Sequence, residues 1–357
     1  MRILTTIAFL SYTATAGAIS VFSDDEATLL QQGLRTTADE FIVPSYAAYA
    51  DASSSLQTSL KAYCNDGGTI GAVHEDFAAM FLAWQRASIV QIGPVADAEG
   101  PLRIQMWPDP KGFSRRAVMS AVKNADDALL EKDGLSGRSI ALINLTALEL
   151  LLYGDLVPAS YECDLSLAIT SFQADLAEEM VDQWSVGGTY RTAYDTAFTG
   201  NDIYPDIDSL LRDVLAGGVV YVDRIRKFKL LRGLGSSPGM ARPERTEAQR
   251  SSLGLKSIEV SFRALRDFYE TPLGLFDVAP DMDGSIEYFV LGETAGSIAD
   301  SLASIDAPMA EIAREDGERA KELRRFAELI LYHESFFKTG FSRSIGLSAG
   351  FTSADGD

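Results

Sequence analysis

Apolar residues recur at three- and four-residue intervals along most of this chain, which is the spacing of an amphipathic α-helix. The clearest run contains Val73, Phe77, Met80, Phe81 and Trp84. Similar helical patterns cover residues 25–63, 114–131, 139–153, 162–184, 207–231, 252–269, 285–303 and 308–339. Alternating strand patterns are scarce, so the sequence predicts an all-α fold.

Segments rich in Gly, Pro and Asp separate the first helices, at 65–71, 93–112 and 132–137. A longer segment, 233–250, is rich in Gly, Ser, Pro and Arg and is interpreted as a linker or long loop. The length and the 46% apolar content allow one large or two medium-sized cores. We predict two helical bundles packed side by side with a cleft between them, formed by residues 19–200 and 201–357.

Residues 1–18 have the features of a secretory signal peptide. Arg2 precedes a short apolar stretch, and small residues at 14–18 offer cleavage sites. The stretch is too short to span a membrane comfortably, and no later run is long and apolar enough. No Cys follows the cleavage region, so lipid anchoring is not indicated. The alternative is a buried amino-terminal strand.

The formal net charge is −20. A strongly acidic surface repels nucleic acids and anionic lipids, so neither is expected as a partner. Such a surface gathers cations only diffusely. No P-loop, dinucleotide-binding fingerprint or nucleophile elbow occurs in the chain.

Two cysteines are present, Cys64 and Cys163. In an exported protein, a low and even number favours one structural disulfide. The alternatives are two free thiols or a thiolate metal site, and the absence of CxxC spacing argues against the metal site.

The run from Asn144 to Glu149 (Asn-Leu-Thr-Ala-Leu-Glu) resembles the Gly-x-His-x-x-Glu signature of the imelysin-like family. In that pattern the His and Glu are three residues apart, so their side chains leave the same face of a helix and are able to ligate a metal or transfer protons. Glu149 retains the acid. The Gly position holds Asn144 and the His position holds Thr146, and a Thr hydroxyl is a poor ligand compared with an imidazole.

Further segments are similar to the family in order and spacing. They are Trp84-Gln85-Arg86, Gly93-Pro94-Val95, Met106-Trp107-Pro108-Asp109, Arg250-Ser251 and the carboxyl-terminal residues 350–357. The resemblance implies an all-helical protein of two domains, with the signature helix facing the cleft. It also implies one of two activities, because the family includes a proposed metallopeptidase and proteins connected with iron uptake.

Each candidate residue also has a structural interpretation. Without the imidazole, we interpret Glu149 as an interior hydrogen-bond or ion-pair partner, with metal ligation as the alternative. Trp84, Trp107 and Asp109 are expected either to line a pocket or to pack a junction.

Arg250 and Ser251 either bind an anion at a helix start or cap that helix. Asp355 is either a second metal ligand or part of a frayed tail.

Only two histidines occur, His74 and His333, and neither has a partner at helical spacing. Both are interpreted as surface residues. The Asp281–Gly284 segment lacks the remaining ligands of a calcium loop and is discounted.

These observations predict an exported, periplasmic, non-catalytic binding or accessory protein for iron or another metal. Its ligand is a metal ion or small molecule in the inter-bundle cleft, near Glu149, Asn144 and Thr146, and an iron-uptake protein of the periplasm or membrane is a candidate partner. Hard oxygen ligands suit ferric iron or calcium better than zinc. The alternatives are a metallopeptidase and a scaffold that binds a partner protein through an exposed apolar patch.

Overall fold

The computed structural model describes residues 23–96, 100–131, 133–270 and 284–340. Within these ranges the chain is helical and contains no strand, which confirms the predicted all-α class. The proposed signal peptide, Asp355 and the calcium-loop-like segment before Gly284 lie outside the described residues.

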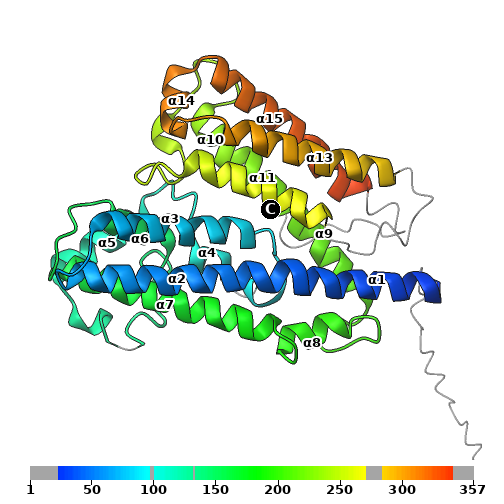
Figure 1. The fold of residues 1–357 in the computed structure, drawn as a ribbon, viewed down its shortest axis with the longest axis horizontal. Helices are drawn as coiled ribbons and strands as arrows, with labels where there is room; N and C mark the ends of the chain where they lie inside the picture. Colours follow the sequence, from blue (N-terminus) through cyan, green and yellow to red (C-terminus); the bar gives the residue numbers. More distant parts are fainter. Residues whose placement is uncertain (1–22, 97–99, 132, 271–283, 341–357) are drawn as a thin grey trace, which may run out of the picture.

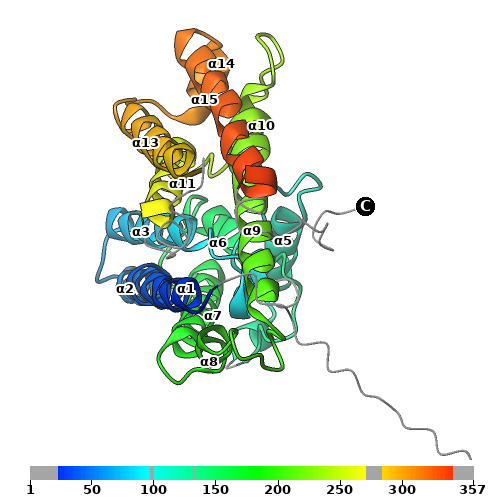
Figure 2. The same cartoon turned by 90° about the vertical axis from the view of Figure 1, so that its right-hand side faces the viewer.

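Two groups of helices lie one above the other, and α9 (Ile207–Asp223) of the second group extends down to the level of the first (Figures 1 and 2). The first group contains α1 (Asp24–Thr37), α2 (Val43–Cys64), α3 (Ile70–Ala87), α4 (Gly100–Ile104), α5 (Phe113–Asn124), α6 (Leu145–Leu152), α7 (Tyr161–Trp184) and α8 (Thr189–Asp195). The second contains α9 (Ile207–Asp223), α10 (Leu231–Leu234), α11 (Gly254–Glu270), α13 (Gly284–Ala303), α14 (Met309–Glu315) and α15 (Glu318–Ser335). Short 3-10 turns occur at Gly93–Ala96, Asp127–Leu129 and Pro243–Arg245, and π-helical turns at Ala38–Ile42, Arg224–Leu230 and Phe336–Gly340. Division of the chain into two bundles at residue 200 stays a prediction.

Most predicted helices are present, and three of them are shorter than their apolar pattern. The helix expected at 139–153 begins only at Leu145, because Asn144 caps its amino terminus. The helix expected at 114–131 ends at Asn124, where Ala125 has a left-handed backbone (φ 45°). The helix expected at 308–339 is interrupted at Asp316, which also has a positive φ of 49°.

The core of the first group forms where α2 packs between α3 and α7. Its large, completely buried side chains include those of Tyr46, Tyr49, Phe77, Trp84 and Trp184. In the second group α11 packs against α13 and α9 against α15, while α11 also packs on α3. The α3–α11 contact therefore brings the two groups together.

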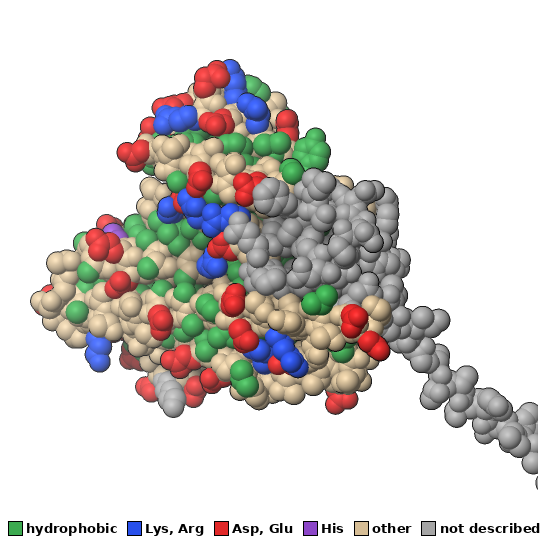
Figure 3. Space-filling view, turned by 45° about the vertical axis from the view of Figure 1, so that its right-hand side comes forward, with side chains coloured by type: hydrophobic (Ala, Val, Ile, Leu, Met, Phe, Trp, Pro, Cys, Tyr) green, Lys and Arg blue, Asp and Glu red, His purple; other side chains and the backbone are tan. Residues whose placement is uncertain are grey.

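The acidic side chains spread over the visible face rather than forming one block (Figure 3). Lys and Arg side chains are interspersed among them, including near the level where the two groups meet. No helix in the described part of the chain combines the length and the apolar character needed to cross a membrane.

Cys64 at the end of α2 and Cys163 at the start of α7 form a disulfide, with their Cα atoms 5.8 Å apart. This confirms the predicted pairing. The bridge spans 99 residues of sequence and fastens together two long helices that share a core.

We expect the Cys64→Ala/Cys163→Ala double variant to unfold more easily, because the unfolded chain is released from a long covalent loop. The expected loss in the free energy of unfolding is about 2–5 kcal/mol, measured by urea denaturation. An unchanged midpoint would contradict this. The single variant Cys64→Ala, compared with the double variant, controls for the effect of leaving one free thiol.

Candidate functional site at the junction of the helical groups

Asn144 fixes the start of the signature helix α6. Its side-chain Oδ1 accepts hydrogen bonds from the backbone N–H groups of Thr146 and Ala147, at 2.8 and 3.2 Å. Its Nδ2 donates to Ser114 Oγ on α5. The Asn144 side chain is completely buried, so it is a structural cap and has no surface for a ligand in this arrangement.

Thr146 occupies the histidine position of the signature. Its hydroxyl donates a hydrogen bond to the carbonyl oxygen of Met106, at 3.2 Å. This contact ties α6 to the segment that carries Trp107 and Asp109. The position therefore supplies a link between segments.

Glu149 is 7% exposed and reaches across to the second helical group. Its Oε1 accepts hydrogen bonds from both the backbone N–H and the hydroxyl of Ser251, at 2.9 and 2.8 Å. Burial raises the pKa of Glu149 above its ordinary value of 4.5, and the Ser251 hydrogen bonds and the charge of Arg250 oppose this shift. Glu149, Arg250 and Ser251 thus form one cluster from segments about 100 residues apart in sequence.

Trp107 and Asp109 follow Met106, the residue that Thr146 contacts, and they make different contacts. The Asp109 carboxylate accepts from the backbone N–H groups of Phe113 and Ser114, both at 2.8 Å, and so caps α5. The Trp107 carbonyl accepts from the Arg224 guanidinium at 3.1 Å, and the guanidinium carbon of Arg232 lies 5.8 Å from the centre of the Trp107 ring. Trp107 therefore contacts both helical groups, and Asp109 serves the first group.

Trp84 lies elsewhere. Its side chain has no exposed surface, and its ring packs in the core with the Tyr49 ring at a centroid distance of 5.9 Å. It is therefore a residue of the core of the first helical group.

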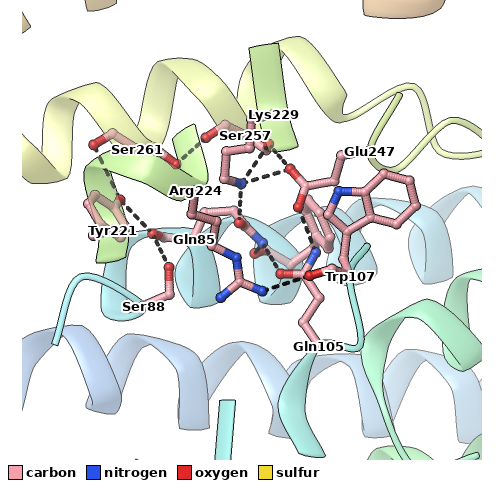
Figure 4. Close-up of polar contacts among 11 residues, drawn as sticks. Gln85, Ser88, Gln105, Trp107, Tyr221, Arg224, Lys229, Glu247, Ser257 and Ser261 are labelled. Carbon is pink, nitrogen blue, oxygen red and sulfur yellow. Dashed lines mark hydrogen bonds and ion pairs between the residues drawn. The ribbon is translucent and has the colours of Figure 1, made fainter. Parts of the chain in front are cut away.

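A buried polar network crosses the junction next to this cluster (Figure 4). The Lys229 ammonium donates to Gln85 Oε1, Glu247 Oε2 and Ser257 Oγ, at 2.5, 2.7 and 3.1 Å. Gln105 Nε2 donates to the second Glu247 oxygen at 2.9 Å, and Gln85 Nε2 donates to Gln105 Oε1 at 3.1 Å. Residues from α3, from the segment after α4 and from the second helical group thereby share one closed set of hydrogen bonds.

The ionic pair at the centre of the network has almost no access to water, since both side chains are at most 2% exposed. Burial lowers the pKa of Lys229, and Glu247 opposes that shift. Burial acts to raise the pKa of Glu247, but Lys229, Ser257 and Arg224 outweigh it and hold that pKa below its ordinary value. We conclude that Glu247 is ionised at neutral pH and paired with Lys229.

The sequence patterns did not reveal this network. Lys229 stood among several basic residues at the end of the predicted 207–231 helix, and Glu247 lay in a segment interpreted as a linker. One feature of the sequence could have indicated that Lys229 is buried. It lies between the apolar residues Phe228, Leu230 and Leu231, which is unusual for a solvated lysine.

The Imelysin family model matches residues 42–331 of this chain. The chain belongs to the imelysin family. Among solved structures, an imelysin-like protein from Psychrobacter arcticum 273-4 is similar with a TM-score of 0.74 and 18% identity, over 91% of this chain and 98% of that one. At this identity the likeness shows the fold alone. No protein with a curated description matches the chain.

This imelysin-family protein does not assemble a dedicated metal centre from its described residues, where no group of three or more His, Cys, Asp or Glu side chains converges. At the signature helix Glu149 is a single carboxylate already engaged by Ser251. The described residues therefore do not fit a resident metal ion at this position, and Asp355 as a second ligand stays a prediction.

The two histidines differ from the expected surface placement. His333 is completely buried, and burial lowers its pKa to about 3, so its interpretation as a surface residue was wrong. His74 is half-buried. Its ring stacks on Tyr153 of the α6 end at a centroid distance of 4.0 Å, and its Nε2 lies 2.9 Å from the Leu152 carbonyl oxygen.

Replacing Lys229 by Met should strongly destabilise the protein, because it leaves the Glu247 carboxylate buried without its cation. We expect a loss of about 3–5 kcal/mol in the free energy of unfolding, measured by chemical denaturation. The exposed neighbour Lys227→Met is the matched control and should change little.

The Lys229→Met/Glu247→Met double variant should lose less stability than the sum of the two single variants, because neither charge is then left alone. Strict additivity of the single effects would show that the two side chains are not coupled.

Glu149 predicts a pH dependence of stability. A folded-state pKa raised above the unfolded value means that the folded protein binds the proton more tightly, so this stabilisation is complete below pH 4.5 and declines as the pH rises through the folded pKa. The free energy of unfolding of the wild type minus that of Glu149→Gln should therefore fall as the pH rises above 4.5. A difference that grows with pH would contradict the direction of the shift.

Proposed function

We propose that this chain is an exported, non-catalytic binding protein of metal acquisition, which takes its ligand at the junction of the two helical groups beside Glu149. The observation that carries the proposal is the position of Glu149, a mostly buried acid on the signature helix that meets Ser251 and the charge of Arg250 from the other group. A ligand bound there touches both groups at once.

The hydrogen bonds of Thr146 and Glu149 on the signature helix favour a binding role over a catalytic one. The Thr146 hydroxyl is committed to the Met106 carbonyl, and Glu149 is committed to Ser251. A peptidase with this signature requires a general base next to an imidazole. Neither Thr146 nor Glu149 provides that arrangement. The metallopeptidase alternative therefore has no specific observation in its favour.

Iron is the ligand metal that the family resemblance suggests, and the carboxylate and hydroxyl oxygens of Glu149 and Ser251 suit a hard cation. Since Glu149 is one carboxylate, the cation would bring further oxygen ligands with it, as a chelate. Arg250 beside Glu149 would then favour the negative charge of such a chelate.

Export is proposed on the signal-like residues 1–18 and supported by the Cys64–Cys163 disulfide, because such bonds persist in oxidising compartments such as the periplasm. Attachment through a lipid is not proposed, and neither is a nucleic-acid partner. An iron-uptake protein in the periplasm or membrane is the proposed partner.

The proposal is tested by calorimetric titration of the metal-stripped mature protein with ferric citrate, zinc and calcium. We expect stoichiometric binding of the ferric complex in the wild type and at least a tenfold weaker affinity in Glu149→Ala, because the mutation removes the central carboxylate. The exposed acid Glu322 supplies the control variant Glu322→Ala, which should bind like the wild type.

Weak binding of equal strength in all three proteins would overturn the proposal. It would mean that the acidic surface only gathers cations. Loss of hydrolysis of a peptide library in Glu149→Ala, if the wild type cleaves such peptides in a metal-dependent way, would favour the peptidase instead.

A further inference from the structure

Two hollows lie beside α7 and are lined only by residues of the first helical group. Their volumes are about 390 and 350 Å³, within the size range of sites for small molecules. Both are bordered by Arg103, Leu176 and Glu179, so they share one arginine. In Figures 1 and 2, α7 lies on the lower side of the first helical group, whereas α11, α13, α14 and α15 lie above.

One stripe of α7 runs along both hollows. Asp175 borders the first hollow, Glu179 borders both and Gln183 borders the second. These residues follow one another at intervals of four, so they share a helix face with about 6 Å between successive positions. All three offer oxygen acceptors, and the Gln183 Oε1 atom is buried without a hydrogen-bond donor.

Arg103 supplies the opposite charge at the middle of the stripe. Its backbone carbonyl accepts from Gln173 Nε2 of α7 at 2.8 Å, and its guanidinium carbon lies 5.4 Å from the centre of the Phe172 ring. The hydrogen bond positions the Arg103 backbone against α7, and the Phe172 ring contacts the guanidinium. Among residues in the described ranges, no carboxylate lies within 4.0 Å of the Arg103 guanidinium, so its fork of N–H donors is available to a ligand.

The first hollow has an excess of negative charge, because Glu131 and Asp133 border it together with Asp175 and Glu179. None of these four carboxylates has an ion-pair partner within the described part of the chain. A ligand that pairs with the charged groups on both sides therefore carries one carboxylate, which pairs with Arg103, and more than one positive group, which pair with the acids.

We propose that these hollows form a binding site for a small zwitterion with an additional ammonium group, such as a basic amino acid. The ligand carboxylate pairs with the Arg103 guanidinium. Its ammonium groups are held by Glu179 and by the acids of the first hollow, and its aliphatic part lies on Phe172 and Leu176. This site is separate from the Glu149 cluster and does not depend on the proposed function.

The test is calorimetric titration of the full mature protein with L-lysine, and with two probes that each lack one charged group. Cadaverine lacks the carboxylate and norleucine lacks the second ammonium. We expect L-lysine to bind with one-to-one stoichiometry, and both probes to bind at least tenfold more weakly.

Arg103→Gln and Glu179→Gln should each weaken L-lysine binding at least tenfold. Two matched controls should bind like the wild type: Glu178→Gln, an exposed acid next to Glu179 that borders neither hollow, and Arg115→Gln, an exposed arginine of α5. Thermal unfolding of each variant establishes that it is folded, and Glu149→Ala should leave L-lysine binding unchanged.

Three results would overturn the proposal. One is the absence of L-lysine binding to the wild type at millimolar concentration, and another is undiminished binding to Arg103→Gln. The third is equal binding of cadaverine and L-lysine, which would mean that the acidic surface attracts cations without recognising the carboxylate.

Discussion

A buried lysine that must keep its charge partners is the constraint on which the junction of this protein depends. The Lys229 ammonium lies in a region with almost no water, and an unpaired ion there would cost several kcal/mol. Its acceptors come from α3, α11 and the segment before α11. Two hydrogen bonds of the network join the helical groups, from Lys229 to Gln85 and from Gln105 to Glu247. Separating the groups would break both and leave buried polar atoms without partners, so the network favours one arrangement of the groups.

The need to pair buried polar groups also explains the contacts of the signature helix. Glu149 is a mostly buried acid, and its partner is the backbone and hydroxyl of Ser251 on the opposite group. The Thr146 hydroxyl donates to the Met106 carbonyl oxygen, and the Asn144 side chain bonds to the backbone of its own helix and to Ser114 on α5. The helix thus joins the scaffold through groups that a catalytic site would leave free for a substrate, which is the physical basis for preferring a binding role.

The two candidate sites differ in how their polar groups are satisfied. At the junction, most donors and acceptors already have protein partners, so a ligand binds by exchanging contacts. Beside α7, Arg103 and the surrounding carboxylates have no ion-pair partners among the described residues, so a ligand there forms ion pairs without breaking existing ones. The two sites therefore favour different ligands. The junction favours an anionic metal complex, and the site beside α7 favours a zwitterion with an additional ammonium group.

The sequence by itself determined the all-α class, the positions of most helices and the two cysteines that pair, because apolar spacing and cysteine number are local or compositional properties. It also singled out Glu149 as an acid in an apolar helix. Only the tertiary structure decided that Ser251 is its partner, that Trp84 is a core residue, that His333 is buried, and that Lys229 and Glu247 form an ion pair. These outcomes depend on contacts between residues far apart in sequence, and helical periodicity carries no information about which distant side chain meets a buried charge.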